Sequence, residues 1–386
     1  MKLRLTLALF LVMTFSSPSC SSKTSKVLDV KHDKKPSFKV VGYLHEGNFS
    51  QIDQIELFRL THLDIAFANP DELGHLVFEE EKGLPVVVQK AHQAKVKVFI
   101  SLAGGGIDEK LASYWLRVLQ PAYRPTFIRE IVSFCKKNQL DGVDVDIEWN
   151  LIPTITDLYT PFVLELKTAL QTENMGISTA LNVKGLHPSI TQESLEAYDF
   201  INVMVYDKTG IWRPDIPGPH APYDYAEEAL KYWTIERKIP AHKLTLGVPF
   251  YGHDFEAVRY ISYRSILAKN VTLAYQDSVN RTYYNGIPSM VAKTELAKKS
   301  FGGVMIWELA QDAYDDLSLL RAIDQTIKAG HQPVTTYYAD TDGDGYGDPQ
   351  KPTQAVKAPR HYVQNRLDCE DTNPQIYPGS KFKDCH

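Results

Sequence analysis

The feature that most restricts the fold is a repeated alternation of short apolar runs with longer amphipathic segments. Eight runs rich in β-branched and aromatic residues are predicted strands: Phe38–Tyr43, His62–Ala68, Val96–Leu102, Gly142–Ile147, Gly176–Val183, Phe200–Tyr206, Leu244–Pro249 and Gly303–Trp307. Helices are expected between most of them, over Leu84–Lys95, Pro125–Gln139, Asp157–Gln171, Asp224–Lys238, Ser289–Lys299 and Asp315–Lys328. This alternation predicts an α/β fold, a closed (β/α)8 TIM barrel. A doubly wound open sheet is the alternative, but no Gly-rich phosphate turn follows the first strand.

The fourth predicted strand, within LDGVDVDIEWN, carries a row of carboxylates. Because successive side chains of a strand point to opposite faces, it has an acidic face of Asp144, Asp146 and Glu148 and an apolar face of Val143, Val145 and Ile147. Carboxylates about 6–7 Å apart repel one another when ionised, which raises the pKa of at least one of them. A solvated edge strand could carry such a row, but a parallel sheet is covered on both faces. In a barrel the row would point inward and rise toward the C-terminal ends of the strands, where barrels hold their functional sites.

Composition narrows the range of partners. Of the 386 residues, 44% are hydrophobic and 23% are charged, which is ordinary for a soluble globular protein. The net charge is -5 without a long run of one sign, so nucleic-acid binding is not indicated. We expect a monomer.

The first residues, MKLRLTLALFLVMTFSSPSCSSK, have the three parts of a secretory leader. Lys2 and Arg4 form the charged start, Leu5–Phe15 forms the apolar core, and small residues surround Cys20. We therefore expect a signal peptide over residues 1–19 and a linker over 20–36. The protein is then exported, as a bacterial cell-envelope lipoprotein with a lipid anchor at Cys20. Ordinary cleavage and secretion is the alternative.

Four motifs resemble the glycoside hydrolase family 18 chitinases and endo-β-N-acetylglucosaminidases. DGVDVDIE matches the fourth-strand pattern D-G-x-D-x-D-x-E of that family, and MVYD (Met204–Asp207) matches its sixth-strand M-x-Y-D. LGVPFYG (Leu246–Gly252) is similar to its seventh strand, and GGVMIWEL to its eighth, which carries the floor tryptophan. The resemblance covers Lys39 to Lys328, so residues 37–332 are the expected barrel domain. One departure is SLAGGG, in which Ala103 stands where the family has a glycine.

The resemblance implies a retaining glycosidase acting on β-1,4-linked N-acetylglucosamine polymers or oligomers. In this family the substrate's own N-acetyl group attacks the sugar carbon and forms an oxazolinium intermediate, and catalysis needs no cofactor. The implied catalytic residues are Glu148 as general acid/base, Asp146 as holder of the acetamide, Asp144 beneath it, and Tyr206 as a donor to the acetamide oxygen. The implied substrate-binding residues are Tyr43, Phe67, Met204, Asp207 and Trp307. We expect Asp144 and Asp146 to raise the pKa of Glu148.

Each of these assignments has a structural alternative. Glu148 could form a salt bridge, and Phe67 and Trp307 could be plain core aromatics. Asp141 is out of phase with the acidic row and is expected to brace the start of the strand. His220 could line the cleft or be a solvated loop residue.

The resemblance leaves more than one function open. The alternatives are an endo-β-N-acetylglucosaminidase acting on N-glycan cores, a non-catalytic lectin on the same barrel, and a calcium-stabilised surface adhesion protein. Only about fifty residues separate the seventh and eighth strands, too few for the complete extra α+β domain of many processive chitinases. An open, shallow cleft is therefore expected.

The tail, residues 333–386, is rich in Asp and Gly. Four carboxylates repeat part of a calcium loop: Asp340, Asp342, Asp344 and Asp348. Lys351 replaces the Glu expected at the twelfth position, so no complete EF-hand is present. The segment resembles thrombospondin type 3-like calcium motifs, which implies that this small C-terminal tail binds Ca²⁺. Asp368–Gly379, with Asp371, resembles the companion half, and a flexible acidic linker is the alternative.

Three cysteines lie outside the leader. Cys135, on the apolar face of a predicted helix, is expected to be a buried free thiol. Cys369 and Cys385, in the tail of an exported chain, are expected to form a disulfide.

Overall fold

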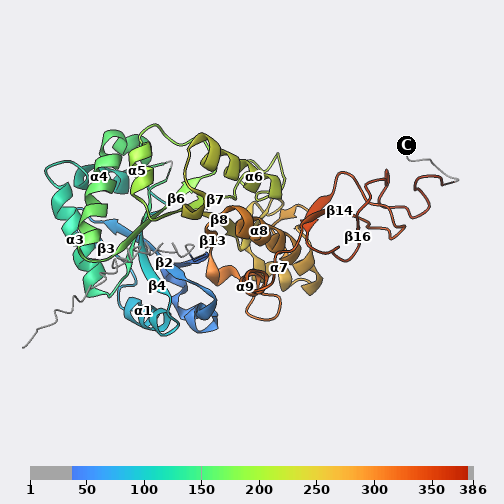
Figure 1. Ribbon diagram of the computed structural model, residues 1–386, viewed down its shortest axis with the longest axis horizontal. Coiled ribbons are helices and arrows are strands. Elements are labelled where there is room, and N and C mark those ends of the chain that lie inside the picture. The colour runs from blue at the N-terminus through green and yellow to red at the C-terminus, as the bar shows by residue number, and fades with distance from the viewer. Residues whose placement is uncertain (1–36, 149, 381–386) are drawn as a thin grey trace, which may run out of the picture. The chain divides into compact units, whose positions relative to one another are not determined.

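The computed structural model describes residues 37–148 and 150–380, and its centre is a closed barrel of eight parallel strands (Figure 1). The strands are β1 (Lys39–His45), β2 (His62–Pro70), β4 (Lys97–Ala103), β5 (Gly142–Asp146), β6 (Gly176–Asn182), β7 (Phe200–Met204), β8 (Leu244–Pro249) and β13 (Gly303–Trp307). Because β1 pairs with both β13 and β2, the sheet is closed. The barrel prediction is confirmed, and the open-sheet alternative is wrong. A short β3 (Leu76–Val77) adds to β2 antiparallel.

Helices surround the barrel (Figure 1). They are α1 (Leu84–Gln93), α2 (Glu109–Val118), α3 (Arg124–Lys137), α4 (Ile152–Thr172), α5 (Gln192–Ala197), α6 (Tyr223–Lys231), α8 (Ile287–Ser300) and α9 (Leu319–Lys328). The apolar residues of α1 recur at helical spacing, and Pro85 lies in its first turn, where its missing N–H has no cost. The sequence analysis did not predict α2 or α5. In α2, the Asp108 side chain caps the helix by accepting a hydrogen bond from the backbone N–H of Leu111.

The two faces of β5 lie in different environments. Val143 and Val145 are fully buried in the apolar layer between strands and helices, and each stabilises the fold by roughly 1.5–3 kcal/mol. Asp144 and Asp146 are also buried, at 0% and 3% exposure, but they lie on the opposite face, inside the barrel. The acidic row is therefore an interior feature and not a solvated edge.

The segment between β8 and β13 contains a small additional sheet. Its antiparallel strands, in the order β10-β9-β12-β11, are Arg259–Ser262, Tyr251–Asp254, Thr282–Tyr283 and Ser278–Val279. One short helix, α7 (Tyr263–Leu267), follows β10. The sequence analysis placed no strands here, because runs of two to four residues carry too little alternation to be recognised. The segment is thus a reduced α+β insertion.

The tail forms a second small sheet, in which β14 (Thr335–Ala339) lies between β15 (Pro352–Ala355) and β16 (Tyr362–Val363). Strand β15 contacts α8, and α8 is buried on all sides between Ser289 and Ala297. The Thr353 hydroxyl donates a hydrogen bond of 3.2 Å to Asp277 in the insertion. The sheet is therefore packed on the barrel domain.

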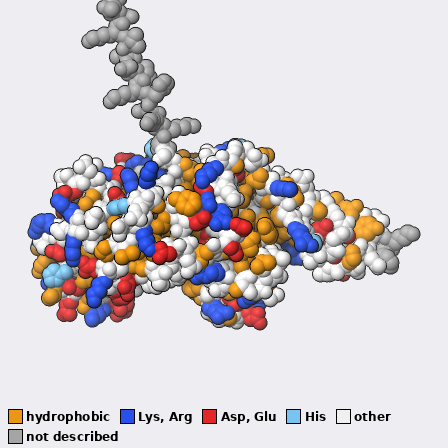
Figure 2. Space-filling model, turned by 90° about the horizontal axis from the view of Figure 1, so that it is seen from below, with side chains coloured by type: hydrophobic (Ala, Val, Ile, Leu, Met, Phe, Trp, Pro, Cys, Tyr) orange, Lys and Arg blue, Asp and Glu red, His pale blue; other side chains and the backbone are white. Residues whose placement is uncertain are grey.

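Several predictions fall outside the described residues. The leader, Cys20 and Cys385 lie there, so export, lipid anchoring and the Cys369–Cys385 disulfide stay predictions. Cys135 is free and buried, as expected. Within residues 37–148 and 150–380, none of the helices combines the length and apolar character needed to cross a bilayer. On the face drawn in Figure 2, acidic and basic side chains are interspersed.

Candidate active site

Asp144 lies at the centre of a hydrogen-bond network inside the barrel. Its carboxylate accepts three hydrogen bonds, from the hydroxyls of Tyr43 (2.7 Å), Ser101 (2.8 Å) and Ser178 (2.7 Å). Burial raises the pKa of Asp144, and these three donors oppose the rise because they favour the ionised form. Each donor comes from a different strand, so the network fixes Asp144 relative to β1, β4 and β6.

Asp146 and Glu148 lie nearer the C-terminal end of the barrel. The Oδ1 atom of Asp146 is buried and has no hydrogen-bond partner within the described chain. Burial, followed by the charges of Glu148, Asp144 and Asp64, raises the pKa of Asp146 well above its usual range. The unpaired oxygen of Asp146 is available to a polar ligand.

The pKa of Glu148 is raised to about 7. Burial is the main cause, and the charge of Asp207 is the second. The raised pKa agrees with the sequence-based expectation. The charge that raises it is that of Asp207, while Glu148 in turn raises the pKa of Asp146. The sequence could not indicate this, because Asp207 follows β7, on the far side of β6 from β5.

Sequence reasoning missed a third buried carboxylate, Asp64 of β2. Asn202 of β7 donates to Asp64 (3.3 Å) and to the Tyr43 hydroxyl (3.1 Å). Burial and the charge of Asp144 raise the pKa of Asp64 well above its usual range. The signal was present, because Asp64 and Asn202 are polar residues flanked on both sides by apolar residues in otherwise buried strands.

A cluster of apolar side chains, mostly aromatic, lies beside these carboxylates; it includes Phe67, Trp307, Tyr43 and Met204. Phe67 and Trp307 are partly exposed, and their rings are stacked 5.7 Å apart with an interplanar angle of 21°. Tyr43 packs against Trp307 at 5.4 Å but is only 1% exposed, so it supports the wall from beneath and presents its hydroxyl to Asp144. Met204, also partly exposed, belongs to the same cluster. Flat aromatic faces beside carboxyl groups suit a sugar ring with polar substituents.

Tyr206 and Asp207, which follow β7, complete the set of side chains around the carboxylates. Burial, then the charges of Asp146, Asp207 and Glu148, raises the pKa of the Tyr206 hydroxyl, so it stays protonated and can donate. Asp207 has a left-handed backbone conformation, with φ of 59°, which Asp tolerates better than most residues. Asp207 forms hydrogen bonds with the side chains of His220 and His253, which are both fully buried. His220 is therefore neither solvated nor a simple cleft residue, and His253 was not singled out from the sequence.

The Gly-rich turn after β4 lies against Glu148. A Cβ atom on Gly105 would come within 2.8 Å of Glu148 Oε1, and a Cβ atom on Gly104 would come within 2.7 Å of the Phe67 ring. Asn150 fastens this turn by donating to the carbonyl oxygens of Gly105 (2.9 Å) and Ile107 (3.2 Å). The backbone of this turn therefore lies close to Phe67 and Glu148, although Ala103 stands where the family has a glycine.

Asp141 lies apart from this group. It is 36% exposed and accepts hydrogen bonds from the backbone N–H of Val98 (2.8 Å) and from His92 (2.9 Å). It braces the start of the strand, as its phase in the sequence indicated.

The tail carboxylates form two clusters that share Asp342. One contains Asp340, Asp342 and Asp344, and the other contains Asp342, Asp368 and Asp371, with the ligand atoms of each cluster within 4.8 Å of one another. Three buried carboxylate oxygens have no partner among the described residues: the Oδ2 atoms of Asp342, Asp344 and Asp368. Asp348 belongs to neither cluster and instead pairs with Lys351 at 3.0 Å.

Residues 39–312, which hold the barrel and this site, match the family model for Glycosyl hydrolases family 18. Among solved structures, the GH18 chitinase from the chitin utilization locus of Flavobacterium johnsoniae is 39% identical, with a TM-score of 0.72 over 75% of this chain and 94% of that one. A chitinase-like effector of Moniliophthora roreri is 29% identical, over 53% of this chain and 55% of that protein. An endochitinase of Manduca sexta is 30% identical, over 53% of this chain and 42% of that protein. The chain thus matches about half the length of these two relatives.

Proposed function

The chain belongs to glycosyl hydrolases family 18, and from that premise we propose that it hydrolyses β-1,4-linked N-acetylglucosamine polymers or oligomers with retention of configuration. The observation that carries the proposal is the row of buried Asp144 and Asp146 and half-buried Glu148 at the C-terminal end of a closed barrel, beside the aromatic pair Phe67 and Trp307. A lectin would need no acid, whereas Glu148 has a pKa of about 7, suited to proton donation near neutral pH.

In the proposed reaction, Glu148 donates its proton to the oxygen of the bond that breaks. The acetamide oxygen of the substrate attacks the sugar carbon from the opposite face and gives the oxazolinium intermediate. Glu148, now ionised, then removes a proton from the water that opens this ring. Configuration is retained because the carbon is inverted twice.

The neighbouring side chains hold the acetamide. Asp146, with its unpaired buried oxygen, orients the acetamide N–H, and as the ring becomes positive a carboxylate here stabilises it. The hydroxyl of Tyr206 donates to the acetamide oxygen. Asp144 accepts three hydroxyl hydrogen bonds and lies beneath Asp146, where the two carboxyl groups share a proton; as the ring becomes positive, the proton moves to Asp144 and leaves Asp146 charged. Asp207 contacts the bound sugar, and the stacked Phe67 and Trp307 support it.

We expect the protein to release the chromophore from a chromogenic chitobioside. It should also cleave oligomers of four to six N-acetylglucosamine units into shorter ones. Proton NMR of the first products should show the β-anomer, because the reaction retains configuration. The same assay on a high-mannose N-glycan would test the endo-β-N-acetylglucosaminidase alternative. A protein that binds chitooligosaccharides in calorimetry yet releases no product from either substrate would be a lectin, and the proposal would fail.

We also propose that the tail binds Ca²⁺. The orphaned oxygens of Asp342, Asp344 and Asp368 support this, because a buried carboxylate oxygen without a donor is costly unless a cation meets it. Burial raises the pKa of Asp344 and of Asp368, as expected for carboxylates held close together without a counter-ion. Asp340, Asp342, Asp344, Asp368 and Asp371 would hold the ion, while Asp348 lies outside both clusters and is joined to Asp371 through Lys351.

We expect a calcium chelator to speed proteolysis of residues 335–380 while turnover changes little. Asp342→Asn should have the same effect on proteolysis in the presence of Ca²⁺, because Asp342 belongs to both clusters. Asp348→Asn is the matched control and should leave the Ca²⁺ protection intact. Limited proteolysis followed by mass spectrometry measures both. The proposal of a calcium site would be wrong if the chelator left the rate of cleavage unchanged, or if Asp342→Asn and Asp348→Asn were cleaved at the same rate in Ca²⁺.

A further inference from the structure

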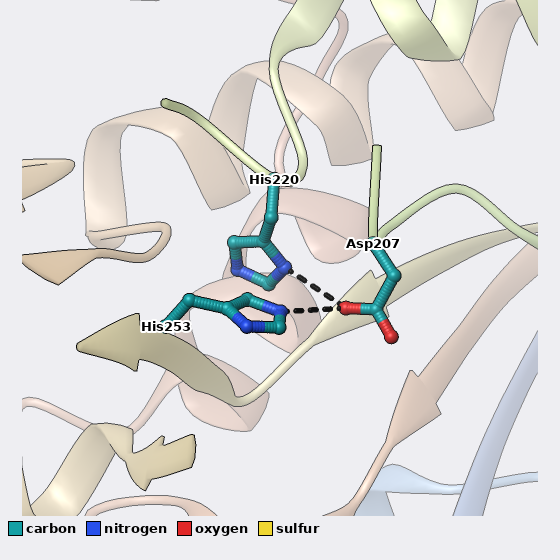
Figure 3. Close-up of side chains that lie close together, drawn as sticks. All are labelled: Asp207, His220 and His253. Carbon is teal, nitrogen blue, oxygen red and sulfur yellow. Dashed lines mark hydrogen bonds and ion pairs between the residues drawn. The ribbon is translucent and has the colours of Figure 1, made fainter. Parts of the chain in front are cut away.

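Asp207 is held by three hydrogen-bond donors that converge on one of its oxygens; Figure 3 shows the two that come from histidines. The Oδ1 atom accepts from the Tyr251 hydroxyl (2.6 Å), from His253 Nε2 (2.9 Å) and from His220 Nδ1 (3.3 Å). The two histidine rings are fully buried and lie 4.6 Å apart between centroids. Tyr251 and His253 come from β9 of the insertion, and His220 comes from the loop before α6. Three separate donors on one atom leave Oδ2 of Asp207 free of this network.

The tautomer of His253 follows from its other nitrogen. The backbone N–H of Ile211 donates to His253 Nδ1 at 3.3 Å. Nδ1 is therefore an acceptor, so the ring proton lies on Nε2 and is directed at Asp207. The Ile211 N–H therefore fixes the direction in which the His253 ring donates.

His220 is restrained in a different way. Its Nδ1 donates to Asp207, while its Nε2 is buried without a partner among the described residues. A second proton on Nε2 would be a buried donor without an acceptor, close to the ammonium group of Lys293, which is anchored on Ala221 O and Asn285 Oδ1. The pKa of His220 is lowered to about 4, mainly by burial; Asp207 opposes this change, and the charges of His253 and Lys293 add to it.

The same three side chains have the composition of a metal site, and their ligand atoms lie within 4.8 Å of one another. A metal ion would need the lone pair of His253 Nε2. The Ile211 N–H already takes the only other lone pair of the ring, which leaves the proton on Nε2. The geometry therefore favours a hydrogen-bond cradle over a metal centre.

We propose that His253 and His220 are positioning residues, each donating an N–H to Asp207, that keep Asp207 ionised and so keep the proton on Glu148. This inference rests on the proposed function, in which Glu148 is the acid. The productive state is then the one in which Glu148 carries a proton and Asp207 does not.

The four tyrosines around the cradle do not compete for this role. The groups that face Asp207, His220 or Glu148 are Tyr206, Tyr225, Tyr251 and Tyr260, with Asp146 and Lys293. Burial first, together with nearby carboxylates, raises the pKa of each of these four tyrosines, so all stay neutral. Burial alone would raise the pKa of Asp207, but the donors from His220, His253 and Tyr251 bring it below its usual range.

The test is the pH profile of kcat and kcat/KM on a chitooligosaccharide. His253→Leu removes one donor, so the pKa of Asp207 should rise and the acid limb should move toward neutral by about one to two pH units. The basic limb, which reports Glu148, should shift far less. His253→Gln keeps an N–H donor and should restore most of the wild-type acid limb. A merely structural role would lower activity without moving that limb and without rescue by Gln.

Tyr251→Phe removes only a hydroxyl, so it carries the same test if His253→Leu does not fold. A folded His253→Leu or Tyr251→Phe protein with the wild-type acid limb would overturn the inference. Loss of the acid limb in His253→Gln would also overturn the inference, because that limb would then report the titration of a histidine and not of Asp207. Failure of the proposed function is a separate result, since it would appear as full activity in Glu148→Gln.

Discussion

Replacement of Glu148 by Gln is expected to lower turnover on chitooligosaccharides by about 10²–10⁴-fold, with binding retained. The amide has nearly the shape of the carboxyl group but cannot give a proton to the leaving oxygen. Glu148 lies so close to Gly105 that a bulkier replacement would displace the Gly-rich turn, whereas Gln fits the same space. Steady-state kinetics should therefore show a large fall in kcat and a KM within a few fold of the wild-type value.

The pH dependence of the wild-type enzyme provides a second measurement of the same group. Glu148 acts as the acid in its protonated form, and its pKa is raised to about 7 by burial and by the charge of Asp207. Activity should therefore be present below pH 7 and fall as the pH rises through about 7. Any residual activity of Glu148→Gln should lack this basic limb.

A stability control separates lost chemistry from lost folding. The pKa of Glu148 is higher in the folded chain than in the unfolded one, so the wild-type protein loses stability as the pH rises from about 4.3 toward 7. Glu148→Gln has no such titration and should be at least as stable as the wild type at pH 8. A folded Glu148→Gln protein that keeps wild-type turnover would sink the assignment of the acid.

The positions of the barrel strands could be predicted from the sequence because their apolar runs are bounded by loops and separated by helices. β13 has the predicted bounds, Gly303–Trp307, and β5 differs from its prediction by one residue. The acidic row could be placed on one face for the same reason, since a strand fixes which residues share a face. These features depend only on local order along the chain.

Features that depend on contacts between distant segments could not be predicted. The Ile211 N–H, His220 and His253 come together because the insertion and the loop after β7 meet, and no local pattern marks that meeting. The tail gives a mixed case. The sequence analysis placed Asp371 in the companion half of the calcium motif, and Asp371 does lie beside Asp342 and Asp368, whereas spacing also suggested Asp348, which lies in neither cluster.

Asp146→Asn should lower turnover by roughly 10²–10³-fold, with little change in KM. The amide can still meet the acetamide N–H, but it has no negative charge with which to stabilise the positive oxazolinium ring. Because the unpaired Oδ1 of Asp146 lies in a buried space of fixed shape, Asn should fit without repacking. The matched control is Asp141→Asn, on the same strand segment but bound only to Val98 and His92 in the described chain, which should keep nearly full turnover.

The pH profile gives the sharper test of Asp146. Glu148, Asp144 and Asp64 raise its pKa by their charges after burial, so the group shares protons and titrates as a unit. With Asn at this position the group loses one titrating member, and the wild-type profile should change shape, not merely height. Asp141→Asn should leave that shape unchanged, because Asp141 lies apart from the group. An Asp146→Asn enzyme with reduced turnover but the wild-type profile would mean that Asp146 acts through packing alone, and that the proposed sharing of a proton with Asp144 does not occur.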